Sequence, residues 1–406
     1  MRHASETVLR GHPDKLCDQI ADHIVALACQ IDSDAYAQIE ASVWSDQVFL
    51  TGFTATRTPF DNPLAEAVRH ACEESGHSPG SAIDPSRYQV HDHVCRQTRD
   101  PREWTRHVND QTIVTGWAGY DAKTHYLPPE HFLAHTLRNA LDHACSPGQA
   151  LQSHGPDGKI VVVIDETPAL HGRPDSWQIL SVLTTMQQDR RASFAAFQQQ
   201  VVAVITNTLR RTAATDPRWR FDPAATRILV NPNGPFTEGG SNSDNGQTGR
   251  KLVMDYYGPR IPIGGGALSG KDPSHIDRAA AYAARKACVE AVAAGAREAS
   301  VRLTYAPGVP TPLDVTWSFP AGGRPPEDAR FDFATLTTLT HNRHHQLTET
   351  ARGTHFFNPR LPWNGVEESE GLEEVSRHRS TGKRDWEERS ALQSFFLRAF
   401  VGIDPI

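Results

Sequence analysis

The most informative stretch of this chain, residues 264–287, reads GGGALSGKDPSHIDRAAAYAARKA. Its glycines let backbone approach a ligand closely, and Lys271 follows them just before an alanine-rich segment with helical character. We expect Asp272 to cap this helix, Pro273 to occupy its first position and Gly295 to end it. Free N–H groups at a helix start favour an anion, so the stretch predicts an anion site beside Lys271.

Two further interpretations of this stretch stay open from spacing alone. The glycines could form a tight turn before an ordinary amphipathic helix. Residues 265–271 also fit the nucleotide-binding pattern G-x-x-x-x-G-K. However, Asp272 stands where a hydroxyl should reach magnesium, and Pro262 interrupts the short segment where a buried strand is required. The pattern therefore disfavours a nucleotide P-loop.

Composition limits the classes of function. The chain has 406 residues, enough for two or three domains. Its 41 Lys and Arg against 48 Asp and Glu give a net charge of -7, which disfavours nucleic-acid binding but permits a local basic pocket. No signal-peptide or membrane-spanning apolar segment is evident, so we expect a cytoplasmic protein with no membrane partner. Six cysteines without a C-x-x-C pair are expected to be buried thiols.

A second motif, Gly-His-Pro-Asp-Lys at residues 11–15, precedes an amphipathic run with helical spacing. It gathers His12, Asp14 and Lys15 at a helix start, where the helix dipole favours phosphate and a carboxylate can hold magnesium. The alternative is that Asp14 is an ordinary first-turn acid. The histidines at 341, 344 and 345 lack metal-site spacing and are interpreted as a polar surface run.

Strand and helix patterns alternate along the chain, which predicts an α+β or α/β fold. Residues 97–108 lack periodicity and are expected to form a loop able to cover a site. No internal sequence repeat is legible. The expected strands cover residues 36–43, 47–54, 87–95, 112–118, 159–165, 178–187, 227–231, 300–305 and 314–319, with the polar residues 44–46 as a hairpin turn between the first two. The expected helices cover 62–75, 129–144, 193–209 and the segment after Pro273.

With residues 248–251, TGRK, these two motifs resemble the S-adenosylmethionine synthetase family. Glu-Thr-Ala at 349–351 and Pro-Trp at 362–363 extend the resemblance to about residues 5–364. It implies three similar α+β domains around a pseudo-threefold axis, with sheets packed face to face in a dimer and active sites shared between subunits. We expect domains at 1–104, 105–233 and 234–406, the last with an extra tail from about 365. Dimer and tetramer are not distinguished.

The resemblance also implies that methionine sulfur attacks C5′ of ATP and that the released tripolyphosphate is cut to diphosphate and phosphate. A thioether is already nucleophilic, whereas the leaving group needs cations. His12 would lie at the bridging oxygen, and Lys159, Arg250, Lys251 and Lys271 would hold the phosphates. Asp14 and Asp277 would bind Mg²⁺ and Glu40 would help bind K⁺. Phe236 would stack on adenine, with Asp157 and Asp244 near the nucleoside.

The sequence departs from the family pattern at the amino-acid end of the site. The resemblance assigns Gln97 and Asp110 to methionine, but the glycines flanking Asp110 are missing. Phe53 stands in place of a glutamate, and His275 in place of a lysine. A histidine with an ordinary pKa near about 6.5 would carry a pH-dependent charge. We therefore expect weaker methionine binding.

Three functional hypotheses follow. The first is synthesis of S-adenosylmethionine from ATP and methionine. The second is an adenosyltransferase that acts on a different nucleophile. The third, a catalytically silent partner subunit, is disfavoured because the residues expected to bind the triphosphate are retained together.

Overall fold

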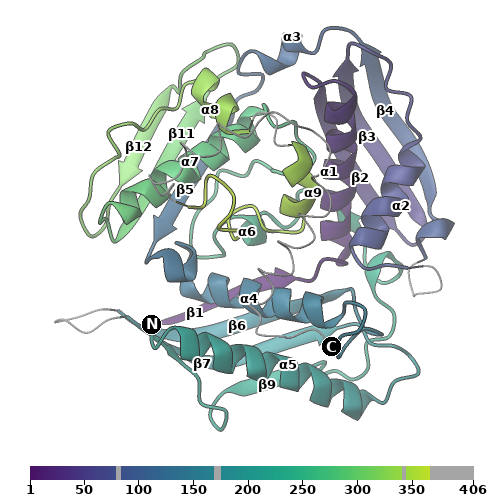
Figure 1. The fold of residues 1–406 in the computed structure, drawn as a ribbon, viewed down its shortest axis with the longest axis vertical. Coiled ribbons are helices and arrows are strands. Elements are labelled where there is room, and N and C mark those ends of the chain that lie inside the picture. Colours follow the sequence, from purple (N-terminus) through teal and green to yellow (C-terminus); the bar gives the residue numbers. More distant parts are fainter. Residues whose placement is uncertain (79–83, 169–174, 341–343, 366–406) are drawn as a thin grey trace, which may run out of the picture. The chain divides into compact units, whose positions relative to one another are not determined.

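The computed structural model describes residues 1–78, 84–168, 175–340 and 344–365. In these residues three sheets are each covered by helices, which confirms the α+β class and the three mixed units expected from the sequence. Figure 1 shows α1, α4 and α7 each lying along a different sheet. The expected tail falls almost wholly outside the described residues. Among the described helices, none is long and apolar enough to cross a membrane.

The amino-terminal sheet has the strand order β10-β2-β3-β4. The hairpin expected between residues 43 and 47 is confirmed, because β2 pairs antiparallel with β3 out to Trp44 and Gln47. Apolar side chains of β2 and β3 face α1 and α2 in one hydrophobic core. The elements are α1 (Pro13–Ile31), β2 (Tyr36–Trp44), β3 (Gln47–Thr56), α2 (Leu64–Glu74), β4 (Gln89–Thr98) and β10 (Gly246–Gln247).

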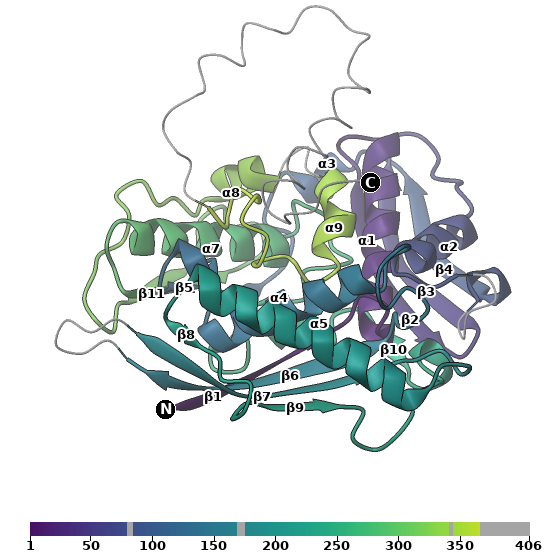
Figure 2. The same cartoon turned by 60° about the horizontal axis from the view of Figure 1, so that its bottom comes forward.

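The central sheet contains β1, β6 and β7 as antiparallel neighbours, with β8 and β9 both pairing parallel to β7. Figure 2 shows α4 and α5 side by side over this sheet. The fully buried Trp177 of β7 belongs to the hydrophobic core that this sheet forms with the two helices. The elements are β1 (Arg2–Val8), α4 (Pro129–Ala144), β6 (Gly158–Thr167), β7 (Ser176–Met186), α5 (Phe194–Thr215), β8 (Trp219–Arg220) and β9 (Arg227–Val230).

The carboxy-terminal sheet has the order β12-β11-β5 and packs against α7. The alanines of α7 permit a very close approach to the sheet. A Cβ atom added to Gly116 would lie 2.2 Å from the carbonyl oxygen of Ala284. The elements are β5 (Thr112–Gly119), α7 (Ile276–Ala293), β11 (Glu298–Tyr305), β12 (Asp314–Ser318) and α8 (Phe333–Thr340), and the short helices are α3 (Arg102–Thr105), α6 (Leu252–Asp255) and α9 (Leu347–Thr350).

The predicted start of α7 was wrong. The helix begins at Ile276 and its N-cap is His275, not Asp272. The Asp272 carboxylate instead accepts hydrogen bonds from the backbone N–H and hydroxyl of Ser274, at 2.8 and 2.6 Å. This local turn delays the helix by one turn. The predicted stop is confirmed, since Gly295 follows the helix with φ 110°.

Each sheet takes a strand from a distant part of the sequence. β1 joins β6, with Val8 opposite Lys159, although the chain continues from β1 directly into α1. β5 joins β11, and β10 joins β2. Chain segments that carry candidate site residues are brought together by these exchanges.

Arg285 of α7 ties that helix to the chain around β5. Its guanidinium donates to the carbonyl oxygens of Trp117 and His125, both at 2.7 Å, and of Tyr126 at 3.1 Å. Burial lowers the pKa of Arg285 to about 10, so the side chain stays charged at neutral pH. The arginine therefore satisfies three backbone acceptors inside the protein.

We expect Arg285→Met to lower the free energy of unfolding by about 3 kcal/mol or more, because buried carbonyl groups lose their donors. Lys286→Met is the matched control on the same helix. Lys286 is 29% exposed and pairs with Glu290 four residues on, so its loss should cost about 0.5 kcal/mol. Urea unfolding followed by circular dichroism measures both. Equal losses would contradict the role assigned to Arg285.

Candidate active site

His12 caps helix α1, and this fixes the state of its ring. The Nδ1 atom accepts a hydrogen bond from the backbone N–H of Asp14 at 3.2 Å. A neutral ring must then carry its proton on Nε2. Burial, helped by the nearby Lys251 ammonium, lowers the pKa of His12 to about 3. His12 is therefore a neutral N–H donor at the start of α1.

Asp14 joins His12 to the cations of a distant segment. Its carboxylate forms an ion pair with Lys251, lies 3.6 Å from Nε of Arg250, and accepts the Gln247 N–H at 3.0 Å. Burial opposes the charge of Asp14, but Lys251 and the Gln247 N–H hold the pKa of this carboxyl below its usual value. The sequence motifs at residues 11–15 and 248–251 thus form one cluster.

A third segment reaches this cluster because the chain packs tightly at Gly11. A Cβ atom there would lie 2.4 Å from Cγ of Pro156, and the Leu9 N–H donates to the carbonyl of Gly158 at 2.9 Å. This contact brings Lys159 near enough to His12 to lower the histidine's pKa further. The Lys159 side chain is exposed at the start of β6. Lys159 is therefore available to a ligand beside His12.

Asp157 faces the loop that follows β9. Its carboxylate accepts the Gly240 N–H at 2.7 Å, and burial raises its pKa to about 6. Asp244, which is exposed, lies in the same loop, where its N–H donates to Gly240 at 3.2 Å. The half-buried Phe236 is held through its carbonyl by the Gln188 N–H at 2.8 Å. The adenosine-binding roles of these residues stay predictions.

A second acid–cation cluster lies at the start of α7. The Asp277 carboxylate pairs with Lys271 and accepts the Thr112 hydroxyl hydrogen bond. His275 repeats the geometry of His12, because its Nδ1 accepts the Asp277 N–H at 3.2 Å. Burial, with Lys271 close by, lowers the pKa of His275 to about 4. The expectation that His275 carries a pH-dependent charge near neutrality was therefore wrong.

The two clusters lie along one edge of strand β2. Gln247 pairs with Ser42, while Lys271 forms a β-bridge with Gln38. Four residues of strand separate these points, which is about 13 Å at the usual rise. Glu40 lies between them on β2, where neighbouring protein raises its pKa and Lys271 opposes that change. The edge of β2 therefore presents an extended row of charges.

Aromatic side chains gather at the Lys271 end of this row, because Phe53 pairs with Gln38 across β2 and β3. The Phe53 ring lies 5.0 Å from the Trp104 ring and 6.3 Å from the Tyr36 ring, measured between centroids. Trp104 lies in α3, so the segment 97–108, expected to be a loop, contains a short helix and the end of β4. Asp110 is exposed but close enough to Tyr36 and His275 to shift their pKa values. Gln97, at the end of β4, is contacted by Arg99 at 3.5 Å.

Two aspartates on α1, Asp18 and Asp22, did not stand out among the sequence motifs. Asp18 accepts the Gly249 N–H at 2.9 Å, and Asp22 accepts the Gly270 N–H at 2.8 Å. Both carboxylates are fully buried. With Asp14 they recur every fourth residue, so they share one face of the helix. That spacing, on a face otherwise expected to be apolar, was the signal that could have revealed them.

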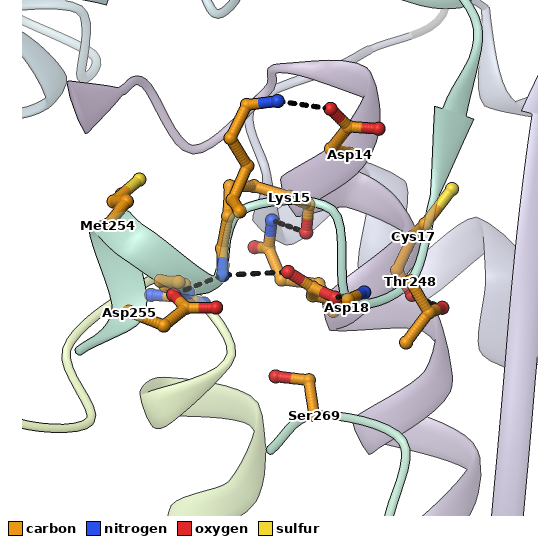
Figure 3. A network of polar contacts seen from close by, with 12 residues as sticks. Asp14, Lys15, Cys17, Asp18, Thr248, Met254, Asp255 and Ser269 are labelled. Atoms are coloured by element: carbon orange, nitrogen blue, oxygen red, sulfur yellow. Dashed lines mark hydrogen bonds and ion pairs between the residues drawn. The ribbon is translucent and has the colours of Figure 1, made fainter. Parts of the chain in front are cut away.

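Lys15, also on α1, is fully buried next to these aspartates. Its ammonium contacts the carboxylates of Asp18 and Asp255, both at 2.7 Å, as Figure 3 shows. Burial, with Asp255 nearby, raises the pKa of Asp18 to about 7 despite the lysine. Lys15 thus joins α1 to α6 inside the protein, and it is not one of the candidate ligand-binding cations.

The structure also bears on the P-loop, histidine and cysteine interpretations. In the described residues between α6 and the glycines at 264–266 there is no strand, so the P-loop interpretation is not supported. Residue 341 lies outside the described residues, and the described part of the chain holds no group of three potential metal ligands. Four cysteines are buried as expected, but Cys95 is exposed and Cys145 is half-buried.

Comparisons with known proteins identify the family of the chain. Residues 1–99, 105–236 and 238–328 match the N-terminal, central and C-terminal domains of S-adenosylmethionine synthetase. An S-adenosylmethionine synthase of Rhodospirillum centenum is 32% identical over 336 residues, covering 81% of this chain and 83% of the relative. One from Clostridium botulinum is 30% identical over 342 residues, covering 80% and 83%. The chain therefore belongs to the S-adenosylmethionine synthetase family.

Proposed function

We propose that this protein is an S-adenosylmethionine synthase that transfers the adenosyl group of ATP to the sulfur of methionine. The observation that carries the proposal is the row of charges along the edge of β2. His12, Lys251 and Lys271 lie along that edge, with Lys159 and Arg250 at the same end as His12, and such a row of cations and donors suits a polyanionic ligand. The family membership of the chain supports the same reaction.

The proposed chemistry needs cations more than a base. A lone pair of the neutral thioether attacks C5′, and the electron pair of the breaking C5′–O bond moves to the triphosphate oxygen. Sulfur becomes a sulfonium, and no proton has to be removed. The cost lies in the charge that develops on the leaving oxygen, which fixed donors and cations stabilise. Tripolyphosphate is then hydrolysed to diphosphate and phosphate.

His12 suits the bridging oxygen in this scheme. The low pKa of His12 keeps its ring neutral, and the N–H of a neutral imidazole would donate a hydrogen bond without transferring its proton. Lys159, Arg250, Lys251 and Lys271 would contact the phosphate oxygens. Phe236, Asp157 and Asp244 would hold the nucleoside, and Gln97, Asp110, His275 and Phe53 would surround methionine.

Mg²⁺ and K⁺ are the proposed metal cofactors. Magnesium in such sites uses one or two carboxylates and completes its shell with water and substrate phosphates. Asp14 and Asp277 each present a single carboxylate in a cation-rich cluster, which fits a metal that arrives with the triphosphate. Bound Mg²⁺ would neutralise phosphate charge, and Glu40 would contribute to a K⁺ site.

We further propose a cytoplasmic homo-oligomer, a dimer or a pair of dimers, with active sites shared between subunits. Trp44 and Phe49 support the oligomer, since they are 54% and 44% exposed on β2 and β3. Both lie on the sheet face that points away from α1. Large exposed apolar residues on one face favour burial against a partner.

The test of the function is product analysis. Protein incubated with ATP, methionine, Mg²⁺ and K⁺ should form S-adenosylmethionine with equal amounts of diphosphate and phosphate, detected by mass spectrometry and ion chromatography. Lys271→Met should abolish most of this activity, while the matched Lys286→Met should not. No sulfonium product at saturating substrates would refute the proposal.

His12 can be tested as a neutral donor. His12→Ala should lower kcat about 100-fold, the usual cost of losing one strong donor to a developing oxyanion. His12→Asn keeps an acceptor for the Asp14 N–H and an N–H donor, so it should lose less. Because the pKa of His12 lies near 3, kcat should not fall between pH 8 and 6 on its account. An acidic limb near pH 6.5 that disappears in His12→Asn would show the assignment to be wrong.

Phe53 should weaken the binding of methionine by removing a partner for its ammonium group. Phe53→Glu is expected to lower KM for methionine about tenfold, equivalent to about 1.4 kcal/mol. Phe53→Leu, which removes the ring without adding charge, serves as the control and should not lower KM. His275 is left unchanged because it caps α7. An unchanged KM in Phe53→Glu would mean that ammonium binding is compensated elsewhere.

A further inference from the structure

Helix α1 contacts two cation-bearing segments, residues 247–255 and 270–271, through a row of aspartates. Asp14, Asp18 and Asp22 accept the N–H groups of Gln247, Gly249 and Gly270, at 3.0, 2.9 and 2.8 Å. All three acceptors are buried, and none of the three donors belongs to α1. The helix therefore fixes the backbone of two segments that are distant in sequence.

The two glycines precede the candidate phosphate-binding cations directly. Gly249 comes before Arg250 and Lys251, and Gly270 comes before Lys271. Both glycines adopt a left-handed backbone conformation, with φ 78° and 80°. A Cβ atom on Gly270 would lie 2.2 Å from the carbonyl of Ile39. The backbone thus turns at each glycine whose N–H an aspartate accepts. The aspartate therefore sets the direction of the chain that carries the cations after the glycine.

Asp18 and Asp22 each also form an ion pair with a buried cation. That cation in turn contacts the segment whose glycine N–H the aspartate accepts. Asp18 is paired with Lys15, whose ammonium reaches Asp255 at the far end of the same segment (Figure 3). Asp22 is paired with Arg278 at 2.8 Å, and Arg278 donates to the Lys271 carbonyl at 2.8 Å. The segments are thus restrained on both sides of the candidate phosphate-binding cations.

We propose that Asp18 and Asp22 are positioning residues that orient Arg250, Lys251 and Lys271 toward the phosphates of the substrate. This inference rests on the proposed function, because it requires a polyphosphate ligand. It assigns the two aspartates no contact with substrate. The competing explanation is that these buried ion pairs affect only the packing and stability of α1.

Tripolyphosphate binding separates the two explanations, because it reports on the cations without requiring chemistry. With inorganic tripolyphosphate and Mg²⁺ as the probe in calorimetry, Asp18→Asn should raise Kd about tenfold. An amide cannot both accept the Gly249 N–H and pair with Lys15, so one restraint is lost. KM for ATP should rise similarly, while KM for methionine should change less than twofold.

Glu130→Gln is the matched control. Glu130 is a buried acid, 1% exposed, that pairs with Arg260 at 3.0 Å and contacts neither cation-bearing segment in the described hydrogen bonds and ion pairs. Its loss should lower stability while leaving the Kd for tripolyphosphate unchanged. A rise in Kd in this variant equal to that in Asp18→Asn would overturn the proposal, because it would show a general effect of destabilisation.

Asp18→Glu provides a second variant in case Asp18→Asn does not fold. It keeps the charge for Lys15 but moves the carboxylate away from Gly249. Positioning predicts a raised Kd for tripolyphosphate, whereas simple charge stabilisation predicts the wild-type value, which would overturn the proposal. Failure of the proposed function is distinct, because the wild-type protein would then itself lack tripolyphosphate binding and sulfonium product.

Discussion

Burying carboxylates along helix α1 is the constraint on which this structure depends. A buried charge without partners is costly, so Asp14, Asp18 and Asp22 require cations and N–H groups. α1 itself supplies Lys15, and the partners from outside the helix come from residues 247–278. Satisfying these acids brings the second half of the chain against α1, and the same contacts line up the cations of the candidate site.

Helices α1, α4 and α7 begin in related ways. Each has an acid at its second position that pairs with a cation: Asp14 with Lys251, Asp277 with Lys271, and Glu130 with Arg260. Negative charge at this position also favours the helix dipole. Of the three, α1 and α7 have a histidine cap and begin beside strand β2, whereas α4 does not. The same structural feature thus occurs at the two helix starts that we propose as ligand sites.

The sequence predicted the elements well where the pattern is local. The hairpin of β2 and β3 and helix α4 follow from period and turn residues, and residues 11–15 marked the start of α1. Asp272-Pro273 was misinterpreted because an Asp-Pro pair has the same appearance in a cap and in a turn that precedes one. The pKa of His275 depends on burial, which no local pattern reveals. Asp18 and Asp22 were missed for a related reason, since their partners Gly249 and Gly270 are more than 200 residues away.

The exchange of strand β1 into the central sheet has a consequence for synthesis of the chain. Val8 pairs with Lys159, so this first strand emerges from the ribosome long before its partner. At about 5–20 residues per second, the wait is on the order of ten seconds or more. Pairings so distant in sequence also slow folding after release, because loop closure must precede them. The nascent amino-terminal segment must therefore stay unaggregated with its first strand unpaired, and the candidate site along β2 can assemble only after residue 277 has been made.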